Sequence, residues 1–148
     1  MVTVGLVRPL CGTLYQQHLD QRKKIVLPVA SRGITSLLLP GGRITHSRFN
    51  IPVPALETSV CNINKKDDLS KLLKMTDLII WDEAPMPNRF CFESLEKSLK
   101  DIMSGTAYTS DKIFGGKVVV FGGDFRQILP VILRGTRSDI IHATINSS

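Results

Sequence analysis

The stretch "LIIWDEAPM", residues 78–86, ends an apolar run with two adjacent carboxylates, Asp82 and Glu83. The run before them has the continuous apolar character of a strand that is buried on both faces of a parallel sheet. Ionised carboxylates at the edge of a core are costly unless a cation, a hydrogen-bond donor or a ligand stabilises them. The stretch therefore predicts a buried strand that ends at a ligand site. An ordinary strand end with solvated carboxylates is the alternative.

Two further apolar runs predict strands on either side of this one. "KIVLPVA", residues 24–30, precedes Ser31, and "KVVVFGGD", residues 117–124, ends in Asp124. Strands that alternate with helices indicate an α/β fold with a parallel sheet, in which the carboxyl ends of the strands form the ligand crevice. We therefore expect Ser31, the Asp82–Glu83 pair and Asp124 to converge at one edge of the sheet.

Helical periodicity and capping residues predict the elements between the strands. The expected helices cover residues 33–39, 89–103 and 138–145, the last capped by Ser138. A further short helix is expected to be capped by Asp67 or Asp68 and to end at Lys74. In the longest of them, one face carries four apolar side chains and is predicted to pack on the core: Phe92, Leu95, Leu99 and Ile102. Residues 43–66 contain two prolines and no sustained period, so they are expected to form an irregular surface loop.

The residues at the strand ends suit nucleotide hydrolysis. Asp82 is a candidate ligand for Mg²⁺ through water, and Glu83 is a candidate base for the attacking water. In "VVVFGGDFRQILP", Asp124 can hydrogen-bond neighbouring loops, and Gln127 offers a donor and an acceptor for a water or a γ-phosphate oxygen. A tight turn with a capping aspartate is the alternative reading of that stretch.

The loop "GGRITHSRF", residues 41–49, has a composition that suits nucleic acid. Cations and hydroxyls bind phosphate oxygens, and aromatic rings stack on unpaired bases; the candidates are Arg43, Thr45, His46, Ser47, Arg48 and Phe49. Residues 1–50 hold seven basic residues and one acid, which accounts for the whole net charge of +6. A solvated basic turn with Phe49 packed inward is the alternative.

Length and composition restrict the other function classes. A chain of 148 residues that is 43% hydrophobic fits one globular domain. Its three cysteines and three histidines are scattered, which gives neither a disulfide framework nor a zinc-site spacing. The apolar opening of the chain is broken by Arg8-Pro9 and predicts neither a signal peptide nor a membrane span. We expect a soluble protein with no membrane partner.

Three stretches, in order, resemble motifs Ia/Ib, II (Walker B) and III of the Pif-type helicases of superfamily one, most closely the form associated with Helitron transposons. They are "ASRGITSLLLPGGRITHSRF", "LIIWDEAPM" and "FGGKVVVFGGDFRQILPV". The resemblance implies that residues 23–148 form part of a RecA-like, P-loop NTPase-type domain, the helicase domain 1A, with a parallel sheet flanked by helices. The fold is expected to be incomplete.

The resemblance also implies an ATP-driven motor that moves 5′ to 3′ on single-stranded DNA. The motor would act in the nucleus or the mitochondrion. Its role would be in DNA repair, recombination or transposition. ATP with Mg²⁺ would lie between this domain and a second RecA-like domain, held here by Asp82, Glu83, Asp124 and Gln127. Glu83 and Gln127 would act in catalysis. Single-stranded DNA would contact Ser31, Gly33, Arg43, Thr45, His46, Ser47, Arg48 and Phe49.

Residues 1–22 depart from the family pattern. Where the phosphate-binding G-x-x-x-x-G-K-[ST] is expected, the sequence has "RPLCGTLYQQHL". ATP binding is therefore in doubt, and a chain without the second RecA-like domain is expected to be inactive alone. Three interpretations stay open: a helicase by descent, a non-catalytic single-stranded-DNA-binding or interaction domain, and a degenerate transposon relic.

Overall fold

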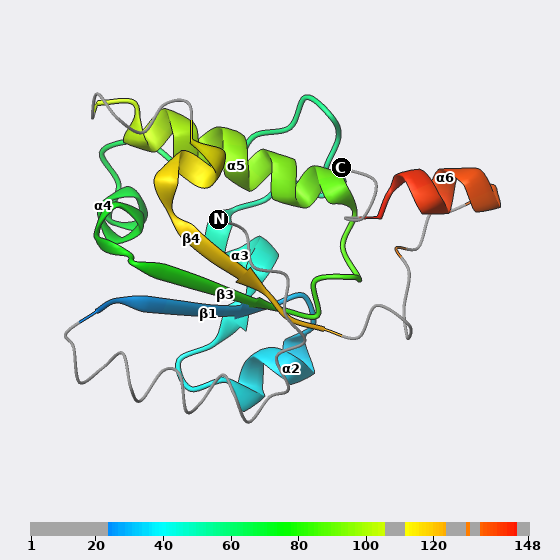
Figure 1. The fold of residues 1–148 in the computed structure, drawn as a ribbon, viewed down its shortest axis with the longest axis horizontal. Helices are drawn as coiled ribbons and strands as arrows, with labels where there is room; N and C mark the ends of the chain where they lie inside the picture. Colours follow the sequence, from blue (N-terminus) through cyan, green and yellow to red (C-terminus); the bar gives the residue numbers. More distant parts are fainter. Residues whose placement is uncertain (1–23, 106–111, 124–129, 131–133, 145–148) are drawn as a thin grey trace.

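A computed structural model describes residues 24–105, 112–123, 130 and 134–144. Its centre is a parallel sheet of strand order β2-β1-β3-β4 (Figure 1). The strands are β1 (Val26–Ala30), β2 (Arg43–Ile44), β3 (Leu78–Asp82) and β4 (Val118–Phe121). The three predicted strands and their parallel arrangement are thereby confirmed.

The register of the sheet brings the carboxyl ends of three strands level. Ala30, the last residue of β1, pairs with Asp82, and Trp81 pairs with Phe121, the last residue of β4. The apolar runs are buried as expected: β3 is buried from Leu78 to Trp81. Residues that follow these strands therefore leave the sheet at one edge, which is where parallel α/β sheets bind ligands.

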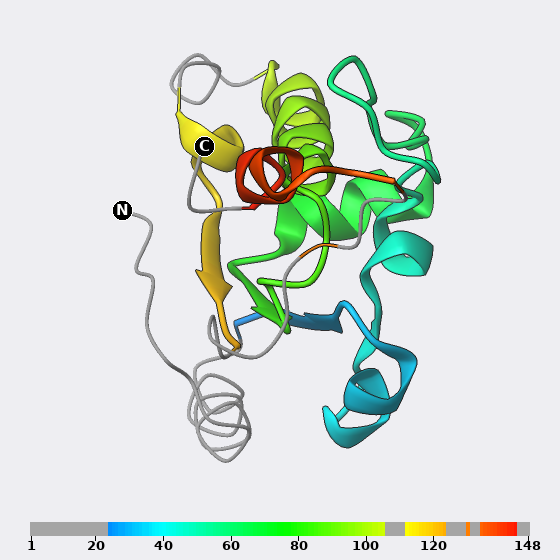
Figure 2. The same ribbon diagram turned by 90° about the vertical axis from the view of Figure 1, so that its right-hand side faces the viewer.

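One face of the sheet packs against α5 (Arg89–Met103), the longest helix of the described residues (Figure 2). Its four predicted core residues are at most 6% exposed, which confirms the predicted face: Phe92, Leu95, Leu99 and Ile102. Trp81 lies at the centre of an aromatic cluster, with its ring centroid 4.4 Å from that of Phe92. Among the described residues, no helix is both long and apolar enough to cross a membrane.

Residues 43–66 contain more regular secondary structure than the sequence predicted. They begin with the short strand β2 and with α3 (Thr45–Phe49), and the remainder runs over α5. The backbone N–H of Cys61 donates to Ser98 of that helix at 2.8 Å. Elements of two and five residues are too short to produce a recognisable period, so their stability comes from tertiary contacts.

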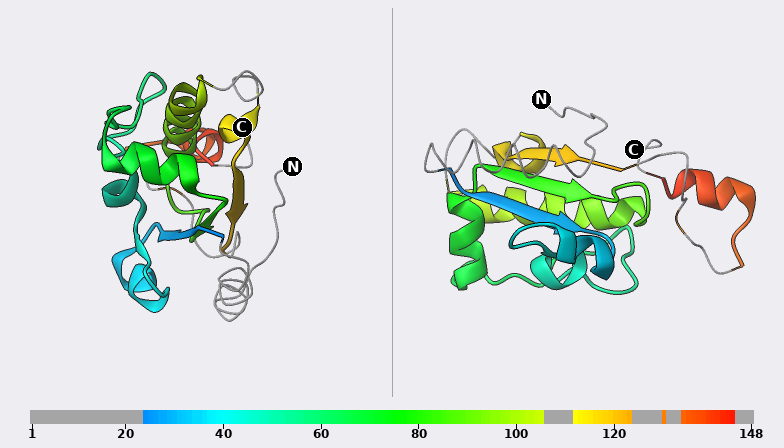
Figure 3. Two further views of the ribbon diagram at one scale, coloured as in Figure 1. Left: turned by 90° about the vertical axis from the view of Figure 1, so that its left-hand side faces the viewer. Right: turned by 90° about the horizontal axis from the view of Figure 1, so that it is seen from below.

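Smaller helices complete the fold: α2 (Gly33–Leu38), α4 (Asp68–Met75), the 3-10 helix η1 (Ile113–Gly116) and α6 (Arg137–His142). Figure 3 shows α4 at the end of the sheet where β1 and β3 begin, and α2 at the opposite end. The predicted cap of the last helix is wrong by two residues. Thr136 rather than Ser138 caps α6, because its side chain and that of Asp139 form a reciprocal capping box.

Candidate functional site

Backbone hydrogen bonds join the turns at the carboxyl edge of the sheet. The N–H of Ser31, after β1, donates to the carbonyl of Asp82 at 3.1 Å. The N–H of Gly122, after β4, donates to Trp81 at 2.8 Å, and the Ala84 N–H donates back to Gly122 at 2.9 Å. The predicted convergence is therefore confirmed for Ser31 and for Asp82. Asp124 and Gln127 lie outside the described residues.

Asp82 is the last residue of β3, and its carboxylate is half-buried. Oδ1 accepts a hydrogen bond from the Glu83 N–H at 2.8 Å, which fixes the side chain. Within the described part of the chain no donor forms a hydrogen bond with Oδ2, so that oxygen can receive a metal-bound water. The described residues contain no group of three or more metal-ligating side chains. A single carboxylate suits Mg²⁺, which keeps several waters and takes other ligands from the phosphates of a nucleotide.

Glu83 stands in a left-handed backbone conformation, with φ of 56°. Such a conformation is uncommon for a residue with a Cβ atom and is typical of sharp turns at functional sites. The turn is closed by the N–H of Met86, which donates to the Glu83 carbonyl at 3.2 Å. Glu83 therefore lies directly after the end of β3, next to Asp82.

Gly123 supports this turn from the end of β4. Its φ of 141° is rare for other residues, and a Cβ atom there would lie 2.6 Å from Cδ of Pro85. The same atom would lie 3.3 Å from Cα of Glu83. The second glycine of "FGGD" therefore allows the backbone of one motif to lie against the carboxylate turn of another.

Ser31 connects β1 to β3 through its side chain. The hydroxyl accepts a hydrogen bond from Nε1 of Trp81 at 2.9 Å and donates to the Asp82 carbonyl at 3.4 Å. Trp81 is fully buried, so its indole N–H needs a protein partner. The sequence indicated Trp81 only as one apolar residue of a strand. Its position directly before the two carboxylates was the signal that could have identified it as a supporting residue.

The basic segment, Arg43–Phe49, comprises β2 and α3, and the structure corrects two of its predicted contacts. Thr45 and Phe49 are fully buried. Thr45 donates its hydroxyl to the Ala30 carbonyl at 2.9 Å, and the Phe49 ring packs near Trp81. Neither side chain can reach a DNA strand from these positions, so Phe49 follows the inward-packed alternative. Arg43 and Ser47 are exposed.

His46 and Arg48 are the half-buried members of the basic segment. Nε2 of His46 lies 3.7 Å from Sγ of Cys91 on α5, and burial lowers the pKa of His46 below its ordinary 6.5. Burial, followed by the nearby charge of Arg43, lowers the pKa of Arg48. The segment thus presents two neighbouring guanidinium groups, while its histidine favours the neutral form.

Residues 10–148 match the family model described as PIF1-like helicase. A curated relative, the ATP-dependent DNA helicase Pif1 of Psychrobacter sp. (strain PRwf-1), is 32% identical over 122 residues, which cover 82% of this chain and 18% of the relative.

Two solved structures have the same fold. Bacteroides Pif1 bound to ssDNA matches with a TM-score of 0.70 and 26% identity, over 93% of this chain and 31% of that one. The Bacteroides sp Pif1 complex with ADP-AlF4 matches with a TM-score of 0.67 and 25% identity, over 93% of this chain and 31% of that one. These matches confirm the predicted RecA-like parallel sheet flanked by helices. The chain spans less than a third of the length of these relatives.

Proposed function

The chain belongs to the PIF1-like helicase family, and from that premise we propose that it forms part of the first RecA-like domain of an ATP-dependent DNA helicase that moves 5′ to 3′ on single-stranded DNA. The observation that carries the proposal is the meeting of Ser31, Asp82 and Gly122 at the carboxyl edge of the sheet. Walker B carboxylates and a motif Ia turn are expected at this edge in such a motor.

In this proposal the carboxylate turn serves ATP. Asp82 would hold Mg²⁺ through water, and bound Mg²⁺ neutralises charge that develops on the β- and γ-phosphates. Glu83 would accept a proton from the attacking water. Asp124 and Gln127 would complete the site beside the γ-phosphate. Asp82 is half-buried, and among the described residues its carboxylate accepts a hydrogen bond at Oδ1 alone, which fits the metal role.

The DNA track would use the exposed and half-buried residues near the same edge. Arg43, His46, Ser47 and Arg48 would contact the strand, with Gly33 allowing close approach of the α2 backbone. Ser31 would take part through its backbone, because its hydroxyl is engaged with Trp81 and Asp82. The proposed cellular role is DNA repair, recombination or Helitron transposition, in the nucleus or the mitochondrion.

We expect the 148-residue chain to be inactive by itself. The sequence contains no G-x-x-x-x-G-K-[ST], whose amides and lysine bind the β- and γ-phosphates in phosphate-loop enzymes. The family's second RecA-like domain also supplies a cation to the γ-phosphate. Loss of one preorganised charge stabiliser commonly lowers the rate about 10²- to 10³-fold. The losses of the phosphate-loop amides, its lysine and the cation of the second domain would combine here.

Calorimetric titration with Mg²⁺ and a nonhydrolysable ATP analogue tests the nucleotide half of the proposal. We expect no binding by the unmodified chain and binding by a variant that carries a family-type G-x-x-x-x-G-K-T ahead of Gln16. Asp82→Asn in that variant should weaken the Mg²⁺-dependent binding. Tight binding or Glu83-dependent turnover by the unmodified chain would show that residues 1–22 hold a phosphate site of another kind.

A second candidate function is non-catalytic binding of single-stranded DNA. It is favoured by the two guanidinium groups of Arg43 and Arg48, which make no ion pair within the described part of the chain. Either function requires that the basic segment bind DNA. Fluorescence anisotropy with a labelled oligothymidine tests this requirement.

The affinity for the oligothymidine should fall steeply with salt, with a log–log slope of roughly −0.7 per phosphate contact. Replacing Arg43, His46 and Arg48 together by alanine should reduce it. Binding that is absent at low salt, or unaffected by the triple substitution, would reject the DNA role of this segment.

A further inference from the structure

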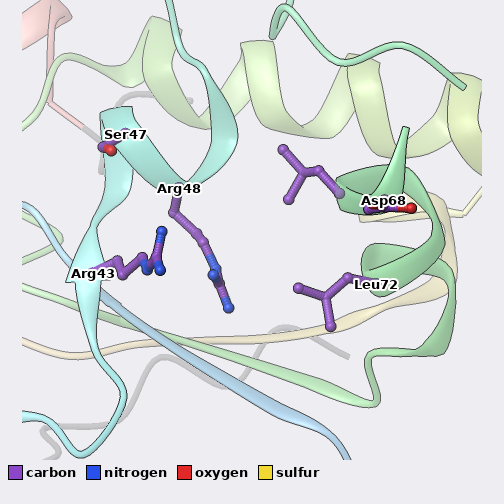
Figure 4. Close-up of a pocket in the computed structure, with 6 residues that line it drawn as sticks. Arg43, Ser47, Arg48, Asp68 and Leu72 are labelled. Atoms are coloured by element: carbon purple, nitrogen blue, oxygen red, sulfur yellow. The ribbon is translucent and has the colours of Figure 1, made fainter. Parts of the chain in front are cut away.

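A pocket of about 310 Å³ lies between the basic segment and α4 (Figure 4). Its volume falls in the range of pockets that hold small ligands. The lining residues are Arg43, Ser47, Arg48, Asp68, Leu69 and Leu72. One wall is therefore cationic and comes from β2 and α3, and the facing wall is apolar and comes from α4.

The cationic wall has unmet hydrogen-bonding and charge requirements. Nε of Arg48 is buried and has no hydrogen-bond partner among the residues that the structure describes. Within the described ranges, the ion pairs include neither Arg43 nor Arg48. Two like charges at one site repel each other, and a buried N–H donor without a partner is unfavourable. An anion between the two guanidinium groups would relieve both conditions.

The carboxylate in the pocket does not supply that anion. Asp68 pairs with Lys71 on its own helix, Nζ to Oδ1 at 2.8 Å. Figure 4 shows Arg43 and Arg48 side by side, facing Leu72 across the gap, with the Asp68 side chain on the far side of that gap. The charge of Asp68 thus remains separate from the two guanidinium groups.

We propose that this pocket binds one nucleotide unit, with its phosphate on Arg43 and Arg48 and its sugar or base against Leu69 and Leu72. The planar guanidinium fork matches the oxygen geometry of a phosphate, and the Ser47 hydroxyl adds a third donor. A bare inorganic anion would leave the apolar wall unused. The inference rests on the proposed function for the source of the nucleotide unit, a DNA strand, since a free nucleotide has the same chemistry.

NMR of the arginine side chains of the full chain tests the pocket directly. The Nε–H signal of Arg48 is assigned by its loss in Arg48→Lys, and it is followed at constant ionic strength during titration with thymidine 5′-monophosphate. We expect a saturable shift, a weaker effect of inorganic phosphate and none of thymidine. An oligothymidine should compete with the mononucleotide for the same site.

Matched variants distinguish binding in the pocket from a general effect of positive charge on the affinity. Arg43→Met should weaken binding of thymidine 5′-monophosphate by about tenfold, as expected for the loss of one charge-assisted interaction. Arg32→Met removes the same charge from an exposed position at the start of α2 and should leave the affinity unchanged. Both replaced side chains are exposed, so the comparison does not depend on a substitution in the core.

Each contrary result overturns a defined part of the inference. No saturable shift of Arg48, or equal losses in Arg43→Met and Arg32→Met, would reject the pocket. Failure of the oligothymidine to compete would reject DNA as the source. If the anisotropy assay detects DNA binding while the mononucleotide fails, only the pocket is wrong. If the mononucleotide binds and DNA does not, the proposed DNA function is wrong instead.

Discussion

The indole N–H of Trp81 donates a hydrogen bond to the hydroxyl of Ser31 at 2.9 Å. The two residues are 50 positions apart in the sequence and belong to the ends of neighbouring strands. The same hydroxyl donates to the Asp82 carbonyl, next to the proposed metal carboxylate. The turn expected to meet DNA and the turn expected to meet ATP are thus linked through one serine side chain.

Ser31→Ala should destabilise the protein, because the buried Trp81 N–H would lose its acceptor. Leaving a buried donor without a partner costs about 1–3 kcal/mol of unfolding free energy. Urea denaturation measures the change. Ser47→Ala, at an exposed site, is the matched control and should stay within about 0.5 kcal/mol of the unmodified chain.

A double-mutant cycle isolates the Ser31–Trp81 interaction from other effects. Trp81→Phe removes the donor and retains an aromatic ring in the core, so Ser31→Ala should cost less in that background than in the unmodified chain. Equal costs in the two backgrounds would mean that the hydrogen bond contributes no stability.

Gly123→Ala should also destabilise the protein and displace the Glu83 turn. The added Cβ would lie 2.6 Å from Pro85 Cδ, and the φ of 141° is unfavourable for alanine. We expect a loss of about 1–3 kcal/mol, as for other strained backbone positions. Thermal unfolding compares it with Gly105→Ala, where a Cβ would meet nothing within 4 Å. Similar melting temperatures for the two variants would show that the turn adapts.

Long periodic elements could be predicted from the sequence, and short ones could not. The α5 face with Leu95 and Leu99 follows from spacing alone, because 15 residues contain four helical turns. In contrast, α3 has five residues and depends on burial of Thr45 and Phe49 at either end. Phe49 is buried, as in the inward-packed alternative. The sequence could not distinguish the two alternatives, because aromatic character does not reveal which face of so short a helix is buried.

The sequence predicted which strand ends carry the residues of the candidate site. Parallel topology alone places Ser31 and Asp82 at one edge. The side-chain link through Trp81 could not be predicted, because it depends on the β1–β3 register, which pairs Val29 with Trp81. The pocket beside α4 likewise depends on how residues 50–67, which have no sustained period, place α4 next to α3.

Cys61 and Cys91 should react slowly with iodoacetamide at pH 8. Burial is the main cause that raises the pKa of each thiol to about 11, so the reactive thiolate is scarce in the folded protein. Relative to a pKa of 9.0, this difference lowers the thiolate fraction about a hundredfold. Peptide mass spectrometry reports each cysteine separately, with the chain in urea as the fast reference. Comparable rates in both conditions would contradict the buried thiol positions.

The unfolding free energy should fall as pH decreases below 6.5 because of His46. Burial against α5 lowers the pKa of His46 in the folded protein, whereas the unfolded chain keeps the ordinary value of 6.5. Between the lowered pKa and 6.5 the unfolded state binds more protons, so stability increases with pH in that window. The contribution is fully present above 6.5 and is lost as pH falls through the folded pKa.

Urea denaturation between pH 7.5 and pH 5, at pH values above the ordinary range of carboxylates, measures the pH dependence attributed to His46. His46→Gln keeps a neutral polar side chain at all of these pH values, so its stability should depend less on pH than that of the unmodified chain. NMR titration of the His46 ring should give a midpoint below 6.5. A midpoint above 6.5 would mean that the imidazolium is stabilised in the folded protein, and the slope in the unmodified chain would then have the opposite sign. That result would also favour a cationic His46 in the proposed contact with DNA, whereas the expected midpoint assigns most of the positive charge of the segment to Arg43 and Arg48.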